Sequence, residues 1–176
     1  MPTKHLIIDG ATASDQWQTI ADDISFDGTL DEATLDGKGA IISLARLEAE
    51  ADTLRQRNTP IGVILRAGEK VGEDPHRLAP FLDMLSLVAI EFPVYRNGRG
   101  FSAARILREQ YNYKGELRAT GDVLYDQWQF MHRCGINAYE IDGDIPLATF
   151  TKAMDSLPDA YQPAGDDKRG ILWRRS

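Results

Sequence analysis

The chain has a single cysteine, Cys134, among 176 residues. One thiol excludes an internal disulfide framework, a CxxC redox pair and an iron–sulfur cluster held by cysteines of this chain. It favours a reducing compartment, so we expect a cytoplasmic protein. No apolar run is long enough to cross a bilayer, and residues 1–5 lack the apolar stretch of a secretory signal. These absences predict neither a membrane anchor nor a secreted, disulfide-stabilised domain.

The sequence also lacks the short motifs that mark common cofactor and catalytic sites. It contains no GxGxxG, no P-loop, no HExxH and no Ser–His–Asp arrangement. Its three histidines, His5, His76 and His132, have no metal-ligand spacing. We therefore expect no metal and no recognisable cofactor. A flavin or NAD(P)H would have to bind without its usual signature.

Acidic residues outnumber basic ones, which gives a net charge of −7. Such a chain repels nucleic acid and anionic membranes, so we expect neither as a partner. Residues 1–40 hold eight acids and two bases, whereas residues 95–118 hold six bases and two acids. This basic segment is either ordinary solvated helix charge or a site for an anion or an acidic partner.

Apolar runs alternate with amphipathic segments from residue 40 onward, which is typical of βα units. The runs expected to form strands are residues 40–44, 61–65, 88–92, 116–119 and 138–141. Strands that are apolar on both faces belong to parallel sheets. The sequence therefore predicts an α/β fold with a parallel sheet of about five strands. Two closures stay open: an open doubly wound sheet, which we favour with a strong curvature, and an incomplete (β/α) barrel.

Three regions are expected along the chain. Residues 1–39 form an acidic N-terminal arm, mostly irregular, with a short edge strand at residues 6–8. Residues 40–158 form the α/β domain, in which Ser102 and Asp122 begin helices and Gly135 ends one. Cys134 lies on an apolar helix stripe and is expected in the core. Residues 159–176 form a polar tail that includes Trp173 between basic residues.

A glycine-rich loop precedes the helix that follows the third expected strand. Gly98 and Gly100 let the backbone approach a ligand, and the helix start at Ser102 offers free N–H groups. Arg99 adds a guanidinium that can bind an oxyanion in a bidentate manner. We predict a small-anion site, for phosphate, sulfate, sulfite or a carboxylate, at these four residues. The alternative is a tight turn without a ligand.

Two further residues are candidates for a catalytic role at the carboxyl ends of the strands. Arg118 lies within the fourth expected strand, where a buried charge needs a partner or lines a site. Asp122 is near enough in sequence to be that partner, a general base or a plain helix cap. Asp142 and Asp144 flank a glycine, but acidic turns are common and we do not assign a metal to them.

The sequence around the glycine loop resembles a known bacterial family. Residues 92–102 match its block FP-x-F-x-DGRGFS, with Asn97 in place of the aspartate. The similarity continues at residues 104–108, 115–124, 126–127 and 133–135. The family is of unknown function and is described as oxidoreductases involved in sulfite reduction, encoded beside the sulfite reductase haemoprotein and the adenylylsulfate reductase. No catalytic residue is carried over from it.

The resemblance implies a role in assimilatory sulfate and sulfite reduction. An oxidoreductase needs an electron carrier, and the residues supply no recognisable site for one. We therefore expect an accessory protein that binds a small anion and acts with sulfite reductase or adenylylsulfate reductase. The alternative is an oxidoreductase that binds a flavin or nicotinamide at the carboxyl edge of the sheet. Self-association is left open.

Overall fold

The computed structural model describes residues 4–23, 37–67, 73–92, 98–143 and 145–155. The expected polar tail and part of the glycine loop, including Arg96 and Asn97, lie outside these residues. The described strands and helices are, in chain order, β1 Lys4–Ile8, β2 Ala11–Ala13, β3 Trp17–Thr19, β4 Gly39–Ser43, α1 Leu44–Leu54, β5 Ile61–Leu65, α2 Asp74–Leu78, β6 Leu85–Phe92, α3 Arg99–Arg105, β7 Glu116–Gly121, α4 Trp128–Arg133, β8 Ala138–Asp142 and α5 Leu147–Asp155.

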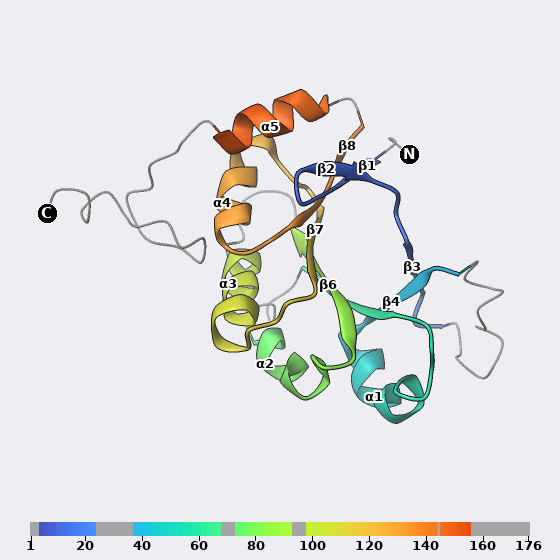
Figure 1. Ribbon diagram of the computed structural model, residues 1–176. Coiled ribbons are helices and arrows are strands. Elements are labelled where there is room, and N and C mark those ends of the chain that lie inside the picture. Colours follow the sequence, from blue (N-terminus) through green and yellow to red (C-terminus); the bar gives the residue numbers. More distant parts are fainter. Residues whose placement is uncertain (1–3, 24–36, 68–72, 93–97, 144, 156–176) are drawn as a thin grey trace, which may run out of the picture.

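The described strands form one curled, eight-stranded sheet in the order β2-β1-β8-β7-β6-β5-β4-β3. Strands β3 to β8 are parallel, while β1 and β2 are antiparallel to their neighbours. All five expected strands are present. The order from β4 to β8 never reverses, so the doubly wound alternative is wrong and the sheet is a half-barrel. Right-handed crossovers in one direction place α1 to α4 on one face of the sheet, and α5, which follows the last strand, lies beside α4 (Figure 1).

The main core lies between this face and the helices. Its fully buried residues include Leu47 of α1, Leu107 after α3 and Trp128 and Met131 of α4. Cys134, at the end of α4, belongs to the same core and is 1% exposed. Gly135 follows with a positive φ of 96°, as expected for a glycine that ends a helix.

The N-terminal arm differs from the expectation. Residues 11–13 and 17–19 are strands, where we expected irregular chain and a helical turn. Strands of three mostly exposed residues are too short to show a hydrophobic period. Each is held by the ladder of a neighbouring strand, β1 or β4.

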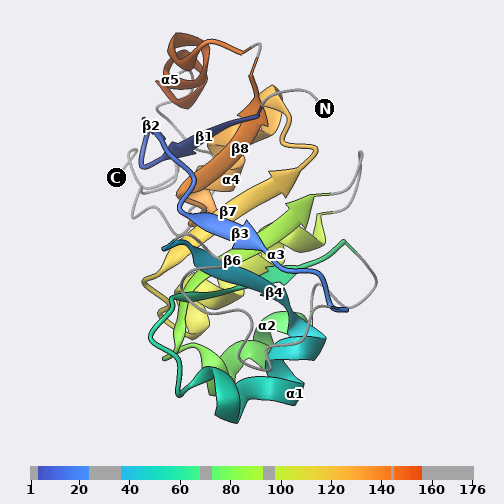
Figure 2. The same cartoon turned by 90° about the vertical axis from the view of Figure 1, so that its right-hand side faces the viewer.

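These two strands explain why the sheet curls. β2 and β3 lie at opposite ends of the strand order, yet only residues 14–16 separate them in sequence. Such a link spans at most about 14 Å, at roughly 3.5 Å per residue. The two edges must therefore approach each other, and residues 14–16 cross the inner face of the sheet (Figure 2). We call residues 11–19 the strap.

The inner face has a small apolar cluster beneath the strap. It consists of Ile41, Leu87 and Ala89, with Trp17 of the strap packed against them. Gly39 makes room for Trp17, because a Cβ at that position would lie 2.5 Å from the indole ring. The packing of Trp17 therefore holds one end of the strap against the sheet.

Candidate functional site

A pocket of about 690 Å³ opens at the carboxyl ends of β6, β7 and β8. In parallel α/β folds this edge is where ligands bind. The lining residues come from five strands or the loops that follow them, and they are Lys4, Ala67, Glu91, Phe92, Gly121, Asp122, Val123, Leu124, Tyr125, Glu140, Asp142 and Ile145. The volume lies within the usual range for pockets that hold small molecules.

One part of the pocket wall is strongly acidic. Glu91, Asp122, Glu140 and Asp142 supply four carboxylates against the single ammonium of Lys4. The Lys4 Nζ donates a hydrogen bond to the carbonyl of Gly121 at 2.9 Å and forms no ion pair with the described residues. The described lining residues therefore carry an excess of negative charge, although one of their carboxylates, Glu140, also pairs with an arginine below the pocket, Arg118, at 3.4 Å.

Two of the four carboxylates are fixed by hydrogen bonds. The backbone N–H of Ala67 donates to Glu91 Oε2 at 2.7 Å, and the hydroxyl of Thr120 donates to Glu140 Oε2 at 2.7 Å. The side chains of Asp122 and Asp142 accept no hydrogen bond from the described residues. The pocket thus combines two oriented carboxylates with two that are open to a ligand.

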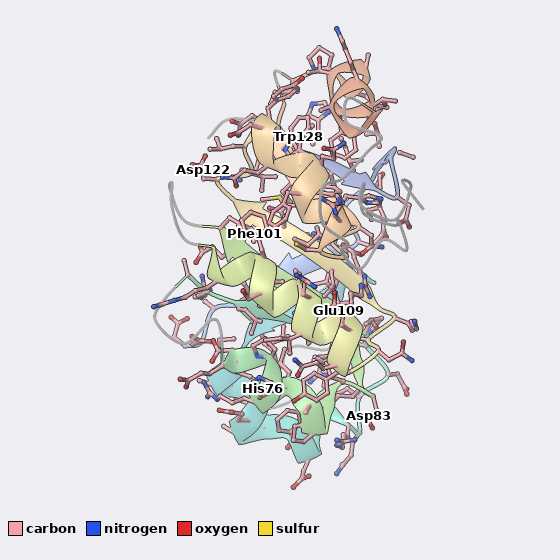
Figure 3. All side chains as sticks on the ribbon, turned by 90° about the vertical axis from the view of Figure 1, so that its left-hand side faces the viewer. His76, Asp83, Phe101, Glu109, Asp122 and Trp128 are labelled. Carbon is pink, nitrogen blue, oxygen red and sulfur yellow. The ribbon has the colours of Figure 1, made fainter. Side chains whose placement is uncertain are left out.

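The rest of the wall is apolar. Phe92, Val123, Leu124 and Ile145 line it, and Tyr125 is 49% exposed although it is a large aromatic residue. A ligand with an apolar body and a positively charged end would match both parts of the wall. Figure 3 shows Asp122, one of the acidic lining residues, beside the start of α4.

Beneath the pocket, Arg118 lies on the inner face of the sheet and is completely buried. Its Nε donates to Glu116 Oε1 at 2.7 Å, and its Nη1 donates to Asp15 Oδ1 at 3.0 Å and to Glu140 Oε1 at 3.4 Å. Asp15 belongs to the strap, and Glu140 lines the pocket. Arg118 therefore connects the strap with the pocket wall.

The electrostatics of Arg118 follow from these neighbours. Burial by itself lowers the pKa of a guanidinium, but the carboxylates of Glu116 and Asp15 outweigh it, so the pKa of Arg118 is raised. Its Nη2 is buried and has no hydrogen-bond partner among the described residues. The expectation that this strand residue needs a charged partner is met, although the partners are not the Asp122 that we considered.

Close packing explains why position 100 is a glycine. This residue is buried against β6, and a Cβ there would lie 2.7 Å from the ring of Phe92 and 3.2 Å from Ile90. Ser102 is not a helix cap, because α3 begins at Arg99 with Gly98 before it. Arg99 and Ser102 are exposed. The anion site at Gly98, Arg99, Gly100 and Ser102 stays a prediction.

Asp122 is not a helix cap either. A 3-10 turn, Tyr125–Gln127, precedes α4, and the caps are Leu124 and Gln127. The N–H of Asp122 donates to the carbonyl of Phe92, which places the residue at the carboxyl edge of β6 and β7. From this position Asp122 lines the pocket.

Several basic side chains of residues 95–118 form ion pairs or hydrogen bonds within the protein. Arg105 pairs with Glu109 at 3.0 Å. Arg108 donates to the carbonyls of Tyr113, Gly115 and Gly135 and to the side chain of Asn137. Burial lowers the pKa of Arg108, whose hydrogen bonds are all to neutral groups. Together with the buried Arg118, these contacts leave less free positive charge than the composition suggested.

Sequence reasoning missed several residues of the site. Glu91 and Glu140 share a signal that was available, because each is a charged residue within a mostly apolar strand, and Thr120 follows Arg118 on the same face of β7. Lys4 and Asp15 gave no signal, because they reach the site through pairings that join distant parts of the chain, β1 with β8 and Asp15 with Arg118.

Two features are absent from the described residues, a metal-binding cluster and a membrane-spanning helix. No three histidine, cysteine, aspartate or glutamate side chains gather closely enough to hold a metal ion there. None of the helices in that part of the chain has the length and apolar character needed to span a membrane.

Fold and pocket together define a half-barrel α/β protein with a ligand-sized, acidic pocket at the carboxyl edge of its parallel strands. The family model described as "Bacterial protein of unknown function (DUF934)" matches residues 62–172, which is more than half of the chain. The chain therefore belongs to this family. No curated protein and no solved structure matches the chain.

The packing of Gly100 can be tested directly. We expect Gly100→Ala to lower the free energy of unfolding by about 1–3 kcal/mol, the usual cost of forcing extra atoms into a packed core. Denaturant unfolding measures this change. Gly98→Ala is the matched control, because a Cβ at Gly98 meets nothing within 4 Å. Equal stability of the two variants would contradict the packing role.

Proposed function

We propose that the chain is an accessory protein of assimilatory sulfite reduction, which acts by binding a partner at its carboxyl-edge pocket. Two independent observations support this proposal. The sequence resembles a family described by its role in sulfite reduction. The pocket carries four carboxylates against one ammonium, and this charge excess carries the proposal.

The charge of the pocket bears on what can bind there. Sulfite, the phosphates of a flavin and the pyrophosphate of NAD(P)H are all anions, which an excess of carboxylates repels. A guanidinium or ammonium group is attracted, and the apolar wall suits the aliphatic stem of an arginine or lysine. A basic side chain of a partner protein fits this pocket better than an anionic substrate does.

The second candidate function is an oxidoreductase of sulfite reduction that uses a flavin or a nicotinamide. The position and volume of the pocket favour it, because α/β enzymes hold such cofactors at the carboxyl edge of their strands. Arg118 and Asp122 are its candidate catalytic residues, and only Asp122 lines the pocket. The acidic wall disfavours it relative to the accessory function.

The proposal includes the partner, the compartment and a small anion. The expected partners are the sulfite reductase haemoprotein or adenylylsulfate reductase, and the expected compartment is the cytoplasm. The anion would bind at Gly98, Arg99, Gly100 and Ser102, away from the acidic pocket. There the exposed helix start and Arg99 support a positive environment.

The excess of carboxylates in the pocket predicts that a short arginine peptide binds the protein. We expect acetyl-Gly-Arg-Gly-amide to shift the NMR signals of Val123, Leu124 and Tyr125, because the guanidinium enters the pocket beside them. The same peptide with citrulline is the control, since it keeps the shape and loses the charge. Equal shifts with both peptides, or none with either, contradict a cation-binding pocket.

Two charge-removing variants, one inside the pocket and one outside it, show whether the arginine peptide binds in the pocket. Glu91→Gln should weaken binding of the arginine peptide, because it removes a charge from the pocket and keeps the side-chain size. Asp52→Asn, an exposed change on α1, should leave the affinity unchanged. Similar losses in both variants would indicate that only the overall charge of the protein attracts the peptide.

The two candidate functions predict different results in cells grown on sulfate. An accessory protein should co-purify with a sulfite-assimilation enzyme, and the purified chain should show no turnover of sulfite with reduced nicotinamide. Glu91→Gln should reduce the co-purification, and Asp52→Asn should not. Turnover by the chain alone, or a visible flavin spectrum of the purified protein, supports the oxidoreductase instead.

The small-anion site is tested by calorimetric titration with sulfite, sulfate and phosphate. We expect binding by the wild type and a clear loss in Arg99→Ala, because the guanidinium supplies the only arginine charge at the described helix start. Lys114→Ala removes an exposed positive charge elsewhere in the basic segment and is the control. Binding that Arg99→Ala leaves intact places the anion at another site.

A further inference from the structure

We propose that the strap regulates the pocket by competing with Glu140 for the guanidinium of Arg118. The inference rests on the proposed function of the pocket and adds its regulation. The strap carries Asp15, the pocket wall carries Glu140, and Arg118 touches both. Thus a change at the N-terminal strap alters the charge that the pocket presents to a cation.

Nη1 of Arg118 binds both carboxylates, one with each of its two N–H groups, so Asp15 and Glu140 compete for the charge and the orientation of the guanidinium. Nη1 of Arg118 donates to Asp15 Oδ1 at 3.0 Å and to Glu140 Oε1 at 3.4 Å. The bond to the strap is the shorter of the two. The bond to Glu140 lies near the outer limit for hydrogen bonds, so this carboxylate is held loosely by Arg118 and keeps its charge available to the pocket.

Arg118 has one more donor nitrogen, Nη2, that could bind Glu140 when the strap is released. Its Nη2 is buried and has no hydrogen-bond partner among the described residues. A guanidinium that is released by Asp15 can present Nη1 and Nη2 together as a fork to the two oxygens of a carboxylate. Glu140 is the nearest carboxylate that also lines the pocket. In this state Arg118 neutralises Glu140.

The strap is suited to leave its place. Residues 14–16 are exposed, and β2 and β3 have only three residues each. The Asp15 carboxylate is 46% exposed, whereas the Arg118 side chain is 1% exposed. Release of the strap therefore moves a half-solvated carboxylate into water and leaves the arginine on the inner face of the sheet with Glu116 and Glu140.

The two states have opposite effects on a bound cation. With the strap in place, Glu140 attracts a basic side chain in the pocket. With the strap released, the fork of Arg118 takes Glu140 and the attraction falls. A partner that captures Asp15 would therefore lower the affinity of the pocket for its cationic ligand, which is a negative coupling between two sites on one chain.

The experiment replaces Asp15 by asparagine in the full chain and measures binding of acetyl-Gly-Arg-Gly-amide. We expect the dissociation constant to rise about fivefold, the lower end of typical couplings between sites. Asp22→Asn is the matched control, because it removes an equal charge from an exposed position near the strap. If both variants change the affinity equally, or if Asp15→Asn binds more tightly, the proposal is wrong.

A double variant tests whether Arg118 transmits the effect. Arg118→Lys keeps the charge and removes the fork, so adding Asp15→Asn to it should change the affinity no more than Asp22→Asn does. A full effect of Asp15→Asn in the Arg118→Lys background would overturn the role of Arg118. Thermal unfolding checks that these variants are folded.

The NMR chemical shifts of the Arg118 side chain test the regulation without the peptide. This measurement does not depend on whether Arg118→Lys folds. The Nη2 protons of Arg118 should move downfield in Asp15→Asn, because they gain the carboxylate of Glu140 as acceptor. In Asp22→Asn they should not move. A downfield shift without any peptide binding by the wild type supports the regulation and rejects the cationic ligand. Unchanged Nη2 signals in Asp15→Asn reject the regulation.

Discussion

The guanidinium of Arg118 is the interaction on which the inner face of this protein depends. A buried charge is costly unless it is paired and hydrogen-bonded. Here Glu116 of the same strand, Glu140 of the neighbouring strand and Asp15 of the strap meet that requirement. Because these partners come from three parts of the chain, the arginine ties the curl of the sheet, the position of the strap and one wall of the pocket to a single side chain.

The helix-facing side of the fold could be predicted from the sequence. Its strands are apolar runs and its helices carry apolar stripes, so periodicity alone gave all five central strands and their parallel arrangement. The order of the strands decided between the two closures, and no local pattern carries that information. The same limit applies to the strap, whose residues 11–13 and 17–19 are too few to show a hydrophobic period and form strands because β1 and β4 offer them partners.

The site was predicted in part. Arg118 was identified because a charge inside an apolar strand needs a reason, and Asp122 because it follows a strand. The role of the glycine loop was harder to infer. Gly100 packs against Phe92, and a glycine required by a neighbouring ring looks the same in sequence as one required by a ligand. The acidic character of the pocket arises from Glu91 of β6 and from Glu140 and Asp142 of β8, which line one pocket only because the sheet brings the carboxyl ends of these strands to the same edge.

The pairing of the first strand has a consequence for how the chain folds. Lys4 lies opposite Asp142 in the ladder, and the other edge of the sheet also uses residues before position 20. Contacts across so long a stretch of chain form slowly, because the loop must close before the contact is made. The βα units from β4 to β8 can assemble from neighbours alone. We expect β1 to join the sheet after these units, because its partner β8 lies near the other end of the described chain.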